Sequence, residues 1–214
     1  MELTSSQARH FYDWFGRAQD LQAFYEDRAI GDLLAHGRFD DALGVFELGC
    51  GTGRLAARLL DRQLPTSARY LGADLSGTMT SLSMARLRRF GHRAAIIQAD
   101  GTQSLPVATG TFDRFLAVYV LDLLGPSEAQ AMVAEAGRLL QGGGLLGIVS
   151  LASGTTTPTW LVSRAWTALW SRAPALTGGC RPITVLPLLD GWHIEHHTQV
   201  SAWALTSEIV IACR

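Results

Sequence analysis

The sequence predicts an α/β fold with a doubly wound, mostly parallel sheet. Short apolar segments alternate with helical segments between residues 45 and 149, which is the pattern of strands covered by helices on both faces. The apolar segments are continuous rather than alternating, as expected of strands that are buried on both sides. A glycine-rich turn at residues 49–53 follows the first of them. We therefore expect ligand-binding residues just after the strands, because sheets of this kind bind ligands beyond the carboxyl ends of their strands.

Seven segments have the composition of strands. Their residues are 45–48, 70–74, 94–99, 115–120, 145–149, 193–196 and 208–212. Helices are expected after the first, second and fourth of these strands, because apolar residues recur at helical spacing after the glycine turn, across residues 78–90, and again after Pro126. Gly142, Gly143 and Gly144 are expected to end the last of these helices.

The whole chain is interpreted as one domain, because 214 residues suffice for one α/β unit with a modest insertion. Residues 1–40 are expected to form an N-terminal helical cap, 41–150 the core, and 191–214 the closing strands. Residues 151–190 are interpreted as an insertion or lid that contains a tryptophan-rich helix. That helix has three interpretations: part of the core, a wall of the substrate pocket, or a helix at a membrane surface.

The composition is that of a globular protein, with 48% hydrophobic and 17% charged residues and a formal net charge of −1. No nucleic-acid partner is expected, because such proteins carry a basic stripe; the basic residues at 86–93 are interpreted as a solvated helix face. Neither a secretory signal nor an apolar run of the roughly 18 residues that span a membrane is visible, so a cytoplasmic location is expected. Three isolated cysteines predict neither disulfides nor a metal site: Cys50, Cys180 and Cys213.

The turn after the first strand reads Glu-Leu-Gly-Cys-Gly-Thr-Gly-Arg, residues 47–54. Its glycines permit a positive φ and leave room for backbone to approach a ligand. A dinucleotide-binding turn, GxGxxG, ends in glycine or alanine, whereas Arg54 stands at that position here. The GK[ST] ending of a phosphate-binding P-loop is also absent. The turn therefore disfavours an NAD(P)-dependent oxidoreductase and a P-loop enzyme.

Acidic residues follow the second and third strands. Asp74 is suited to accept hydrogen bonds from both hydroxyls of a ribose, and the alternative is that it caps the next helix. Asp100 is suited to accept a hydrogen bond from an adenine amine, and the alternative is a turn-forming role.

Across residues 40–150 the chain resembles the class I S-adenosylmethionine (SAM)-dependent methyltransferases, in particular the small-molecule enzymes similar to ubiquinone and menaquinone methyltransferases. Several motifs in the same order and spacing, most of them at the ends of predicted strands, carry the resemblance. They are Glu47-Leu48-Gly49-Cys50-Gly51-Thr52-Gly53, Asp74-Leu75-Ser76 with Met79, Gln98-Ala99-Asp100, Leu105-Pro106, Phe112-Asp113 and Tyr119-Val120-Leu121. The resemblance implies a Rossmann-like seven-stranded sheet whose last strand is antiparallel.

The resemblance also implies how SAM is bound. Residues 47–53 would surround its methionine portion, Asp74 the ribose hydroxyls, and Asp100 the adenine amine. Residues 117–118 would lie near the amino group and the sulfonium, and Tyr12 is the candidate contact from N-terminal helices that close over SAM in the family. An equally open interpretation is that the N-terminal aromatics only pack the cap onto the sheet. The implied cofactor-binding residues are Tyr12, Glu47, Gly49, Cys50, Gly51, Gly53, Asp74, Leu75, Met79, Asp100, Gly101, Ala117 and Val118.

Two positions depart from the family pattern. Ala117 and Val118 stand where the family often has Ser-Asn, and Asp122 stands where relatives often have histidine. No motif places any of the histidines in the site. The candidates for a general base are therefore Tyr119 and Asp122, and Asp122 has the alternative role of capping the turn before Pro126.

The resemblance predicts an enzyme that transfers a methyl group from SAM to an oxygen, nitrogen or carbon nucleophile of a small molecule. Transfer would occur by in-line displacement, which requires alignment and exclusion of water and no metal. Two alternatives stay open at this point. One is a SAM-binding protein without catalysis, and the other is a lipid methyltransferase that works at a membrane surface.

Overall fold

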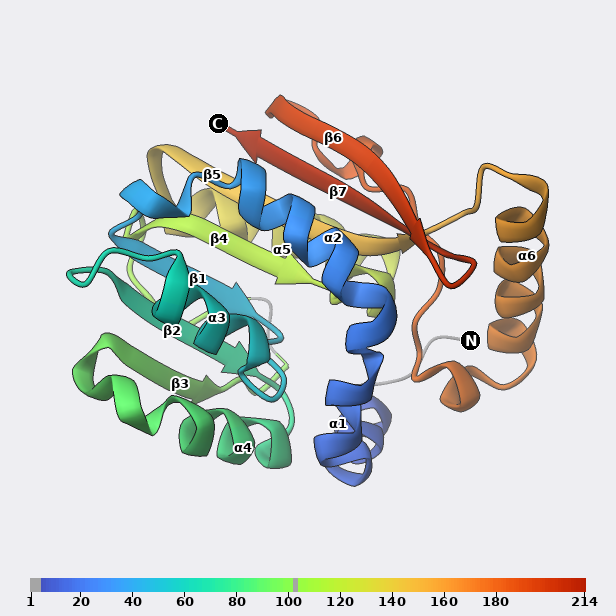
Figure 1. Cartoon of the computed structure of the whole chain (residues 1–214), viewed down its shortest axis with the longest axis horizontal. Coiled ribbons are helices and arrows are strands. Elements are labelled where there is room, and N and C mark those ends of the chain that lie inside the picture. The colour runs from blue at the N-terminus through green and yellow to red at the C-terminus, as the bar shows by residue number, and fades with distance from the viewer. Residues whose placement is uncertain (1–4, 102–103) are drawn as a thin grey trace.

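The computed structural model describes residues 5–101 and 104–214. Its centre is a seven-stranded sheet of order β3-β2-β1-β4-β5-β7-β6 (Figure 1). Strand β7 runs antiparallel to both of its neighbours, whereas β1 to β5 are mutually parallel, so the predicted topology is confirmed. The strands are β1 Gly44–Leu48, β2 Arg69–Asp74, β3 Ala94–Gln98, β4 Phe112–Val118, β5 Leu140–Ala152, β6 His193–Ala202 and β7 Leu205–Cys213.

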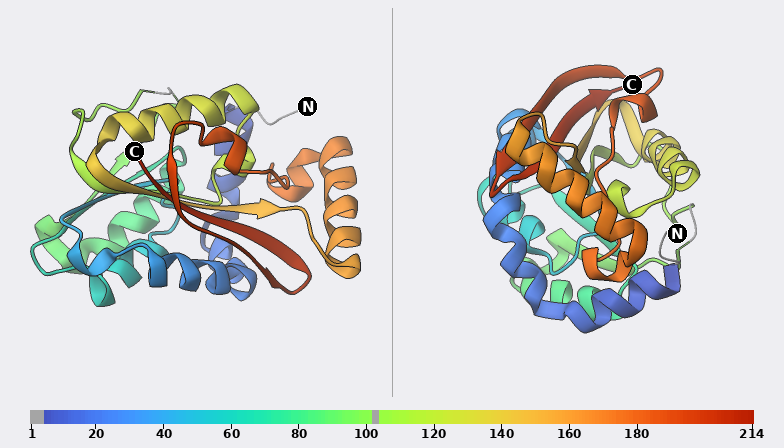
Figure 2. Two further views of the ribbon diagram at one scale, coloured as in Figure 1. Left: turned by 90° about the horizontal axis from the view of Figure 1, so that it is seen from above. Right: turned by 90° about the vertical axis from the view of Figure 1, so that its right-hand side faces the viewer.

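Helices cover both faces of the sheet. Figure 2 shows α5 on one face and α2, α3 and α4 on the other. The helices are α1 Ser5–Phe15, α2 Ala23–His36, α3 Arg54–Arg62, α4 Gly77–Leu87, α5 Pro126–Leu139 and α6 Thr157–Arg172. Shorter 3-10 turns are Gly16–Gln22, Phe39–Asp41, Arg88–Arg93, Leu121–Leu123, Pro174–Thr177 and Leu186–Leu188. Among the described residues, no helix is both long enough and apolar enough to cross a membrane.

Each central strand contributes to two hydrophobic cores, one on each face of the sheet. Val45 packs with residues of α2 and α3, whereas the next residue, Phe46, packs with residues of α5. Leu145 and Leu146 divide between the two cores in the same way. Successive side chains of a strand point to opposite faces, so a strand with both faces covered must be apolar throughout.

The glycines at 142–144 do not end a helix, so that expectation is wrong. Helix α5 ends at Leu139, and the glycines lie within β5. The pairing of β4 with β5 shifts between Phe112 and Arg114, and Gly143 has a φ of +77° there. Glycine at this position accommodates a bulge that a residue with a side chain would strain.

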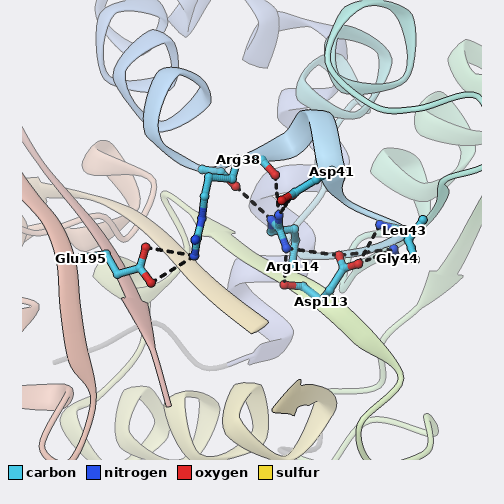
Figure 3. Close-up of polar contacts among 8 residues, drawn as sticks. Arg38, Asp41, Leu43, Gly44, Asp113, Arg114 and Glu195 are labelled. Carbon is cyan, nitrogen blue, oxygen red and sulfur yellow. Dashed lines mark hydrogen bonds and ion pairs between the residues drawn. The ribbon is translucent and has the colours of Figure 1, made fainter. Parts of the chain in front are cut away.

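A buried arginine connects the start of β4 to the segment just after α2 (Figure 3). The Arg114 guanidinium donates to the carbonyl oxygen of Gly37 at 2.9 Å, to that of Asp113 at 3.0 Å, and to that of Arg38. It also pairs with the carboxylate of Asp41. Only 8% of the Arg114 side chain is exposed. Water therefore has little access to these carbonyl oxygens and would not readily replace the guanidinium as their donor.

Asp113 and Arg38 extend this cluster. The Asp113 carboxylate accepts the backbone N–H of Leu43 at 2.7 Å, which holds the start of β1 against β4 (Figure 3). Arg38 pairs with Glu195 of β6 at 3.0 Å. The cluster lies at the amino ends of the central strands, at the opposite end of the sheet from the glycine turn.

The N-terminal segment lies beyond the carboxyl ends of the strands (Figure 1). It was expected to be helical throughout, but the α-helix is interrupted at Gly16, whose φ is +50°, and continues as a 3-10 turn over residues 16–22 before α2. The bend carries α1 across the end of the sheet, where it is tied to α4. Helix α6 lies outside the sheet, past the end of β5 (Figure 1).

Candidate functional site

Two adjoining cavities lie at the carboxyl ends of β1, β2 and β4. The larger has a volume of about 190 Å³ and the smaller about 60 Å³. Side chains and backbone of Tyr12, Gln19, Gly49, Val118 and Tyr119 line both. The cavities are therefore two parts of one site, and these shared residues mark the junction between them.

The glycine turn forms the floor of the site. Gly49 and Gly51 have φ values of +66° and +51°, so both occupy the left-handed region that favours glycine. A Cβ at Gly49 would lie 2.3 Å from Cγ2 of Val120, and one at Gly51 would lie 2.6 Å from Oε1 of Gln19. Gly53 has a different role: it lines neither cavity, and a Cβ there would meet Oγ of Ser83 at 2.5 Å.

Asp74 lines the larger cavity, and the end of β2 positions it. Its Oδ2 accepts the Gly51 N–H at 2.9 Å, and its Oδ1 accepts the Ser76 N–H at 2.9 Å. Each carboxylate oxygen retains a further lone pair for a ligand hydroxyl. Burial raises the pKa of Asp74 above its ordinary value. The helix cap is Ser76 rather than Asp74, because the Ser76 hydroxyl accepts the Met79 N–H.

Of the other predicted adenosine contacts, three line the larger cavity and one does not. Leu75, Met79 and Gly101 line the larger cavity. Asp100 is exposed and lines neither cavity. The backbone at the end of β3 reaches the cavity at Gly101, where φ is +88°.

Glu47 and Cys50 line the smaller cavity. The Tyr70 hydroxyl donates to Oε2 of Glu47 at 2.6 Å, and burial raises the pKa of Glu47 to about 8. Burial also raises the pKa of the Cys50 thiol. With Asp20 and Glu26, Glu47 gives the smaller cavity three carboxyl groups.

A pair of hydrogen bonds and an ion pair hold the N-terminal segment over the glycine turn. The Ser76 hydroxyl and the Thr78 N–H both donate to Oδ1 of Asp13, at 2.5 and 3.1 Å. Arg86 pairs with Asp20 at 2.5 Å. The segment is thus fixed to the start and to the last turn of α4.

The basic residues at 86–93 are partly solvated, as expected, because Arg88, Arg89 and His92 are exposed, but three of the arginines also make contacts within the protein. Besides pairing with Asp20, Arg86 donates to the Thr52 hydroxyl at 2.8 Å. Arg89 pairs with Asp61, and Arg93 donates to the carbonyl oxygen of Pro65 at 2.8 Å.

Gln19 is a site residue that the sequence did not reveal. Its side chain lies over Gly51, and its Oε1 is buried without a hydrogen-bond partner. A buried acceptor without a partner costs about 1–3 kcal/mol, which a ligand donor would recover. Leu105, which belongs to one of the family motifs, also lines the larger cavity. Other lining residues come from the N-terminal segment, α2 and the segments after β4, where no local motif marks them: Asp20, Gln22, Tyr25, Glu26, Ile30, Leu123, Leu124, Glu128 and Met132.

Three tyrosines and one cysteine form the wall of the smaller cavity near its junction with the larger one: Tyr12, Tyr25, Tyr119 and Cys180. The Tyr12 hydroxyl donates to the carbonyl oxygen of Gly178 at 3.5 Å and lies 4.0 Å from Sγ of Cys180. The rings of Tyr25 and Tyr119 meet edge to face at 5.7 Å. Burial raises the pKa of all three tyrosines, so the wall is neutral at ordinary pH. The 151–190 segment contributes to the site through Cys180.

The residues at and just after the end of β4 differ in whether they reach the cavities. Val118 lines both cavities, whereas Ala117 is buried and lines neither. Tyr119 has a φ of +55°, an unusual backbone conformation for a residue with a side chain, and its hydroxyl lies 2.7 Å from Oγ of Ser207.

Asp122 is fully buried and lines neither cavity. Its Oδ2 accepts the Leu151 N–H at 3.4 Å, and its Oδ1 has no hydrogen-bond partner. It does not cap the turn before Pro126, because Glu128 accepts the Gly125 N–H instead. The location of Asp122 therefore gives no support to a role as general base.

The buried Asp122 predicts that stability falls as pH rises. Burial raises its pKa from 3.8 to about 7, so the folded protein retains a proton that the unfolded chain releases. The stabilising effect of that proton is complete below pH 3.8 and is lost as pH rises through about 7. We expect Asp122 by itself to lower the free energy of unfolding by about 1–3 kcal/mol between about pH 5 and about pH 8.

Urea denaturation at the two pH values measures this effect, with Asp122→Asn as the matched variant. Asparagine does not titrate and still accepts the Leu151 N–H, so the variant should lose part of the pH dependence. Burial also raises the pKa values of Glu47, Asp74 and Glu26, so these groups titrate in the same direction and contribute to the remainder. An unchanged pH profile in Asp122→Asn would contradict the burial-driven shift.

Comparisons with known proteins identify the family. Residues 45–144 match the model of a methyltransferase domain. Over 188 residues the chain is 31% identical to a trans-aconitate 2-methyltransferase of Azoarcus sp. (strain BH72), covering 86% of this chain and 68% of that protein. The chain belongs to the class I SAM-dependent methyltransferases. This methyltransferase is therefore an enzyme with SAM as its cofactor, and neither a SAM-binding protein without catalysis nor an NAD(P)-dependent oxidoreductase.

More distant relatives agree with the fold. A tRNA N(3)-methylcytidine methyltransferase of Drosophila melanogaster is 24% identical over 156 residues, 68% of this chain and 48% of that one. The structure of the 4+2 cyclase SpnF superposes with a TM-score of 0.74 at 18% identity, covering 100% of this methyltransferase and 97% of that chain. A geranyl diphosphate methyltransferase in complex with GPP and sinefungin gives a TM-score of 0.68 at 14% identity, covering 88% and 78%.

Proposed function

We propose that this methyltransferase binds SAM across both cavities and methylates a small, neutral or positively charged acceptor at their junction. In this proposal the adenosine occupies the larger cavity. Asp74 accepts the ribose hydroxyls, and Leu75 and Met79 contact the sugar or base. The single observation that carries this placement is Asp74, whose two oxygens are held by backbone N–H groups at the edge of the larger cavity.

The smaller cavity fits the amino-acid end of SAM. A positively charged ammonium group is matched by the carboxylate of Glu26 and by the unpartnered Oε1 of Gln19. Its charge would also favour the ionised form of Glu47, whose pKa burial raises to about 8 in the unliganded protein. A carboxylate is matched by the amino end of α3, where backbone N–H groups and the helix dipole attract negative charge. These residues would hold both charged groups of a zwitterion without a further cation.

SAM supplies an electrophilic methyl group on a sulfonium. The residues of the chain would contribute alignment and exclusion of water rather than a strong base. Tyr12 and Tyr119 would close the junction around the reacting atoms, and their raised pKa values make both phenols poor proton acceptors at ordinary pH. Holding the nucleophile in line with the methyl group is the main contribution, worth up to about 7–11 kcal/mol in well-oriented systems.

The charges of the site favour a neutral or cationic acceptor over a polyanion. Arg54 is the only cationic side chain among the described residues that line the two cavities. It is already paired with Glu26 at 2.8 Å and with Asp27 at 2.5 Å. A tricarboxylate such as trans-aconitate would face carboxyl groups without a free counter-charge, which costs several kcal/mol in a partly buried site. The acceptor of the Azoarcus relative is therefore not proposed here.

A panel of acceptors tests this proposal. The purified protein is incubated with SAM and either trans-aconitate, simple phenols, or primary and secondary amines, and formation of S-adenosylhomocysteine is followed by mass spectrometry. We expect turnover with one or more neutral or cationic acceptors and none above the acceptor-free rate with trans-aconitate. Turnover with trans-aconitate alone would contradict the proposed substrate class.

The proposed ribose contact predicts a loss of affinity in Asp74→Ala. Removing the carboxylate leaves the ribose hydroxyls without their acceptor, which we expect to weaken SAM binding by about 1–3 kcal/mol, or roughly 5- to 150-fold. Calorimetry with SAM measures the change. Asp61→Asn serves as the matched control, because Asp61 pairs only with Arg89 among the described contacts and lines neither cavity. Equal affinity in Asp74→Ala and the unmodified protein would contradict the ribose assignment.

A further inference from the structure

A cluster of metal-ligating side chains lies outside the SAM site, where α2 packs against the edge strand β6. Asp32 and His36 come from α2, and His196 comes from β6. Nε2 of His196 lies 2.7 Å from Oδ1 of Asp32, and Nδ1 of His36 lies 3.6 Å from the same oxygen. One ligand atom from each residue lies within 4.8 Å of those of the other two.

Local structure explains why these three residues converge. Asp32 and His36 are four residues apart in a helix, so their side chains share one face. In β6 the pairing with β7 shifts between Ile194 and His196, leaving Glu195 as the extra residue of a bulge. A bulge redirects the side chains beside it, and here His196 faces α2.

The spacing of these atoms matches a tetrahedral metal ion. Ligand atoms bound at about 2.0–2.1 Å around such an ion lie about 3.3 Å apart. The two separations at Asp32, 2.7 and 3.6 Å, fall on either side of that value. Small side-chain rotations would therefore suffice, and these side chains have room to rotate because 46% of His36 and 23% of His196 is exposed.

We propose that Asp32, His36 and His196 form a binding site for a divalent transition-metal ion of the zinc type. Two imidazoles and one carboxylate are ligands that Zn²⁺ accepts readily, and water would complete a four-coordinate sphere. The imidazole rings of His36 and His196 stack in parallel, with centroids 3.8 Å apart and an interplanar angle of 10°. Nε2 of His196 is hydrogen-bonded to Oδ1 of Asp32, whereas Nδ1 of His36 lies 3.0 Å from the backbone carbonyl oxygen of Asp32, a contact that a bound ion would replace.

Two arginines, one in α2 and one just after it, also link this part of the chain to β6. Arg38, which is near the end of the same helix, pairs with Glu195 of the bulge. Arg28 donates to the backbone carbonyl oxygen of Ser201 at 2.9 Å, further along β6. A bound ion would join α2 to the edge strand. Since α2 also carries Tyr25 and Glu26 of the smaller cavity, the ion would stabilise a wall of the SAM site without taking part in methyl transfer.

Binding of Zn²⁺ to the untagged, chelator-treated full chain tests this site. We expect calorimetry to show one strong site per chain and thermal unfolding to shift to higher temperature with ZnCl₂ but not with MgCl₂, because a ligand that binds only the folded state stabilises it. His36→Ala and His196→Gln should each weaken Zn²⁺ binding at least tenfold. His92→Ala, which changes an exposed histidine elsewhere, should leave it unchanged.

Two further measurements keep the test decisive. If a histidine variant unfolds, the visible absorption of Co²⁺ added to the unmodified protein reports the ligands directly. We expect a four-coordinate spectrum without thiolate bands, and the same spectrum in Cys213→Ser, since Cys213 lies on β7 beside β6. Thiolate bands, absence of one-to-one binding, or equal Zn²⁺ affinity in His36→Ala and His196→Gln would overturn the proposal. SAM turnover enters none of these readouts.

Discussion

Replacing Arg114 by alanine is expected to lower the free energy of unfolding by about 3–5 kcal/mol, the usual cost of removing one partner from a buried charged cluster. Its guanidinium donates to three backbone carbonyl oxygens near the start of β4 and the end of α2. In the variant these oxygens lose their donor in a place that water reaches poorly. Asp113 remains satisfied, because it accepts backbone N–H groups at the start of β1.

Urea denaturation at one pH measures the effect, and Arg38→Ala is its matched control. Arg38 belongs to the same cluster but is 52% exposed, so its ion pair with Glu195 should contribute at most about 1 kcal/mol. Arg114 lies far from the carboxyl ends of the strands, so the folded variant should bind SAM normally. Equal stability losses in the two variants, or a lost SAM affinity in folded Arg114→Ala, would contradict this assignment.

Replacing Gly49 by alanine is expected to reduce SAM affinity by two orders of magnitude or more. The added Cβ would lie 2.3 Å from Cγ2 of Val120, a stiff β-branched side chain on the wall of the larger cavity. The φ of +66° adds strain of about 1–2 kcal/mol for a residue with a Cβ. Overpacking adds about 1–3 kcal/mol, so the turn must move or displace Val120 into the space proposed for SAM.

Two control variants separate the causes. Gly91→Ala places alanine at a φ of +58° with no atom within 4 Å of its Cβ, so it should show the conformational strain without a loss of SAM binding. The double variant Gly49→Ala with Val120→Ala removes the clash and should recover part of the affinity. SAM affinity is measured by calorimetry for each protein. Normal binding by Gly49→Ala would contradict the close packing of the turn against the cavity.

The sheet was predictable because its signals are local. Val45 and Phe46 serve opposite cores, so a strand such as β1 has to be apolar at successive positions, and this pattern is visible without any partner. Asp74 was predictable for the same reason, since it is the last residue of an otherwise apolar strand. Strand ends were less accurate: β4 begins at Phe112 rather than at 115, because Asp113 and Arg114 are buried in the polar cluster and interrupt the apolar pattern.

The residues that cover the site could not be located from local patterns. Gln19 meets Gly51 only because the chain bends at Gly16 and crosses the ends of the strands. Cys180 reaches Tyr12 across most of the chain. The resemblance to the family included Gly53, which lines neither cavity; a Cβ there would meet Ser83 of α4. The third glycine of the turn therefore allows close packing against α4 rather than contact with the ligand.

A crystal structure of the complex with S-adenosylhomocysteine tests the placement of the cofactor most directly. We expect the ribose hydroxyls to donate to Asp74, with the amino-acid end beside Glu47 and Gln19 and the sulfur facing Tyr12 and Tyr119 at the junction of the cavities. A nucleoside bound elsewhere, or a ribose that does not contact Asp74, would contradict this placement and the acceptor site inferred from it.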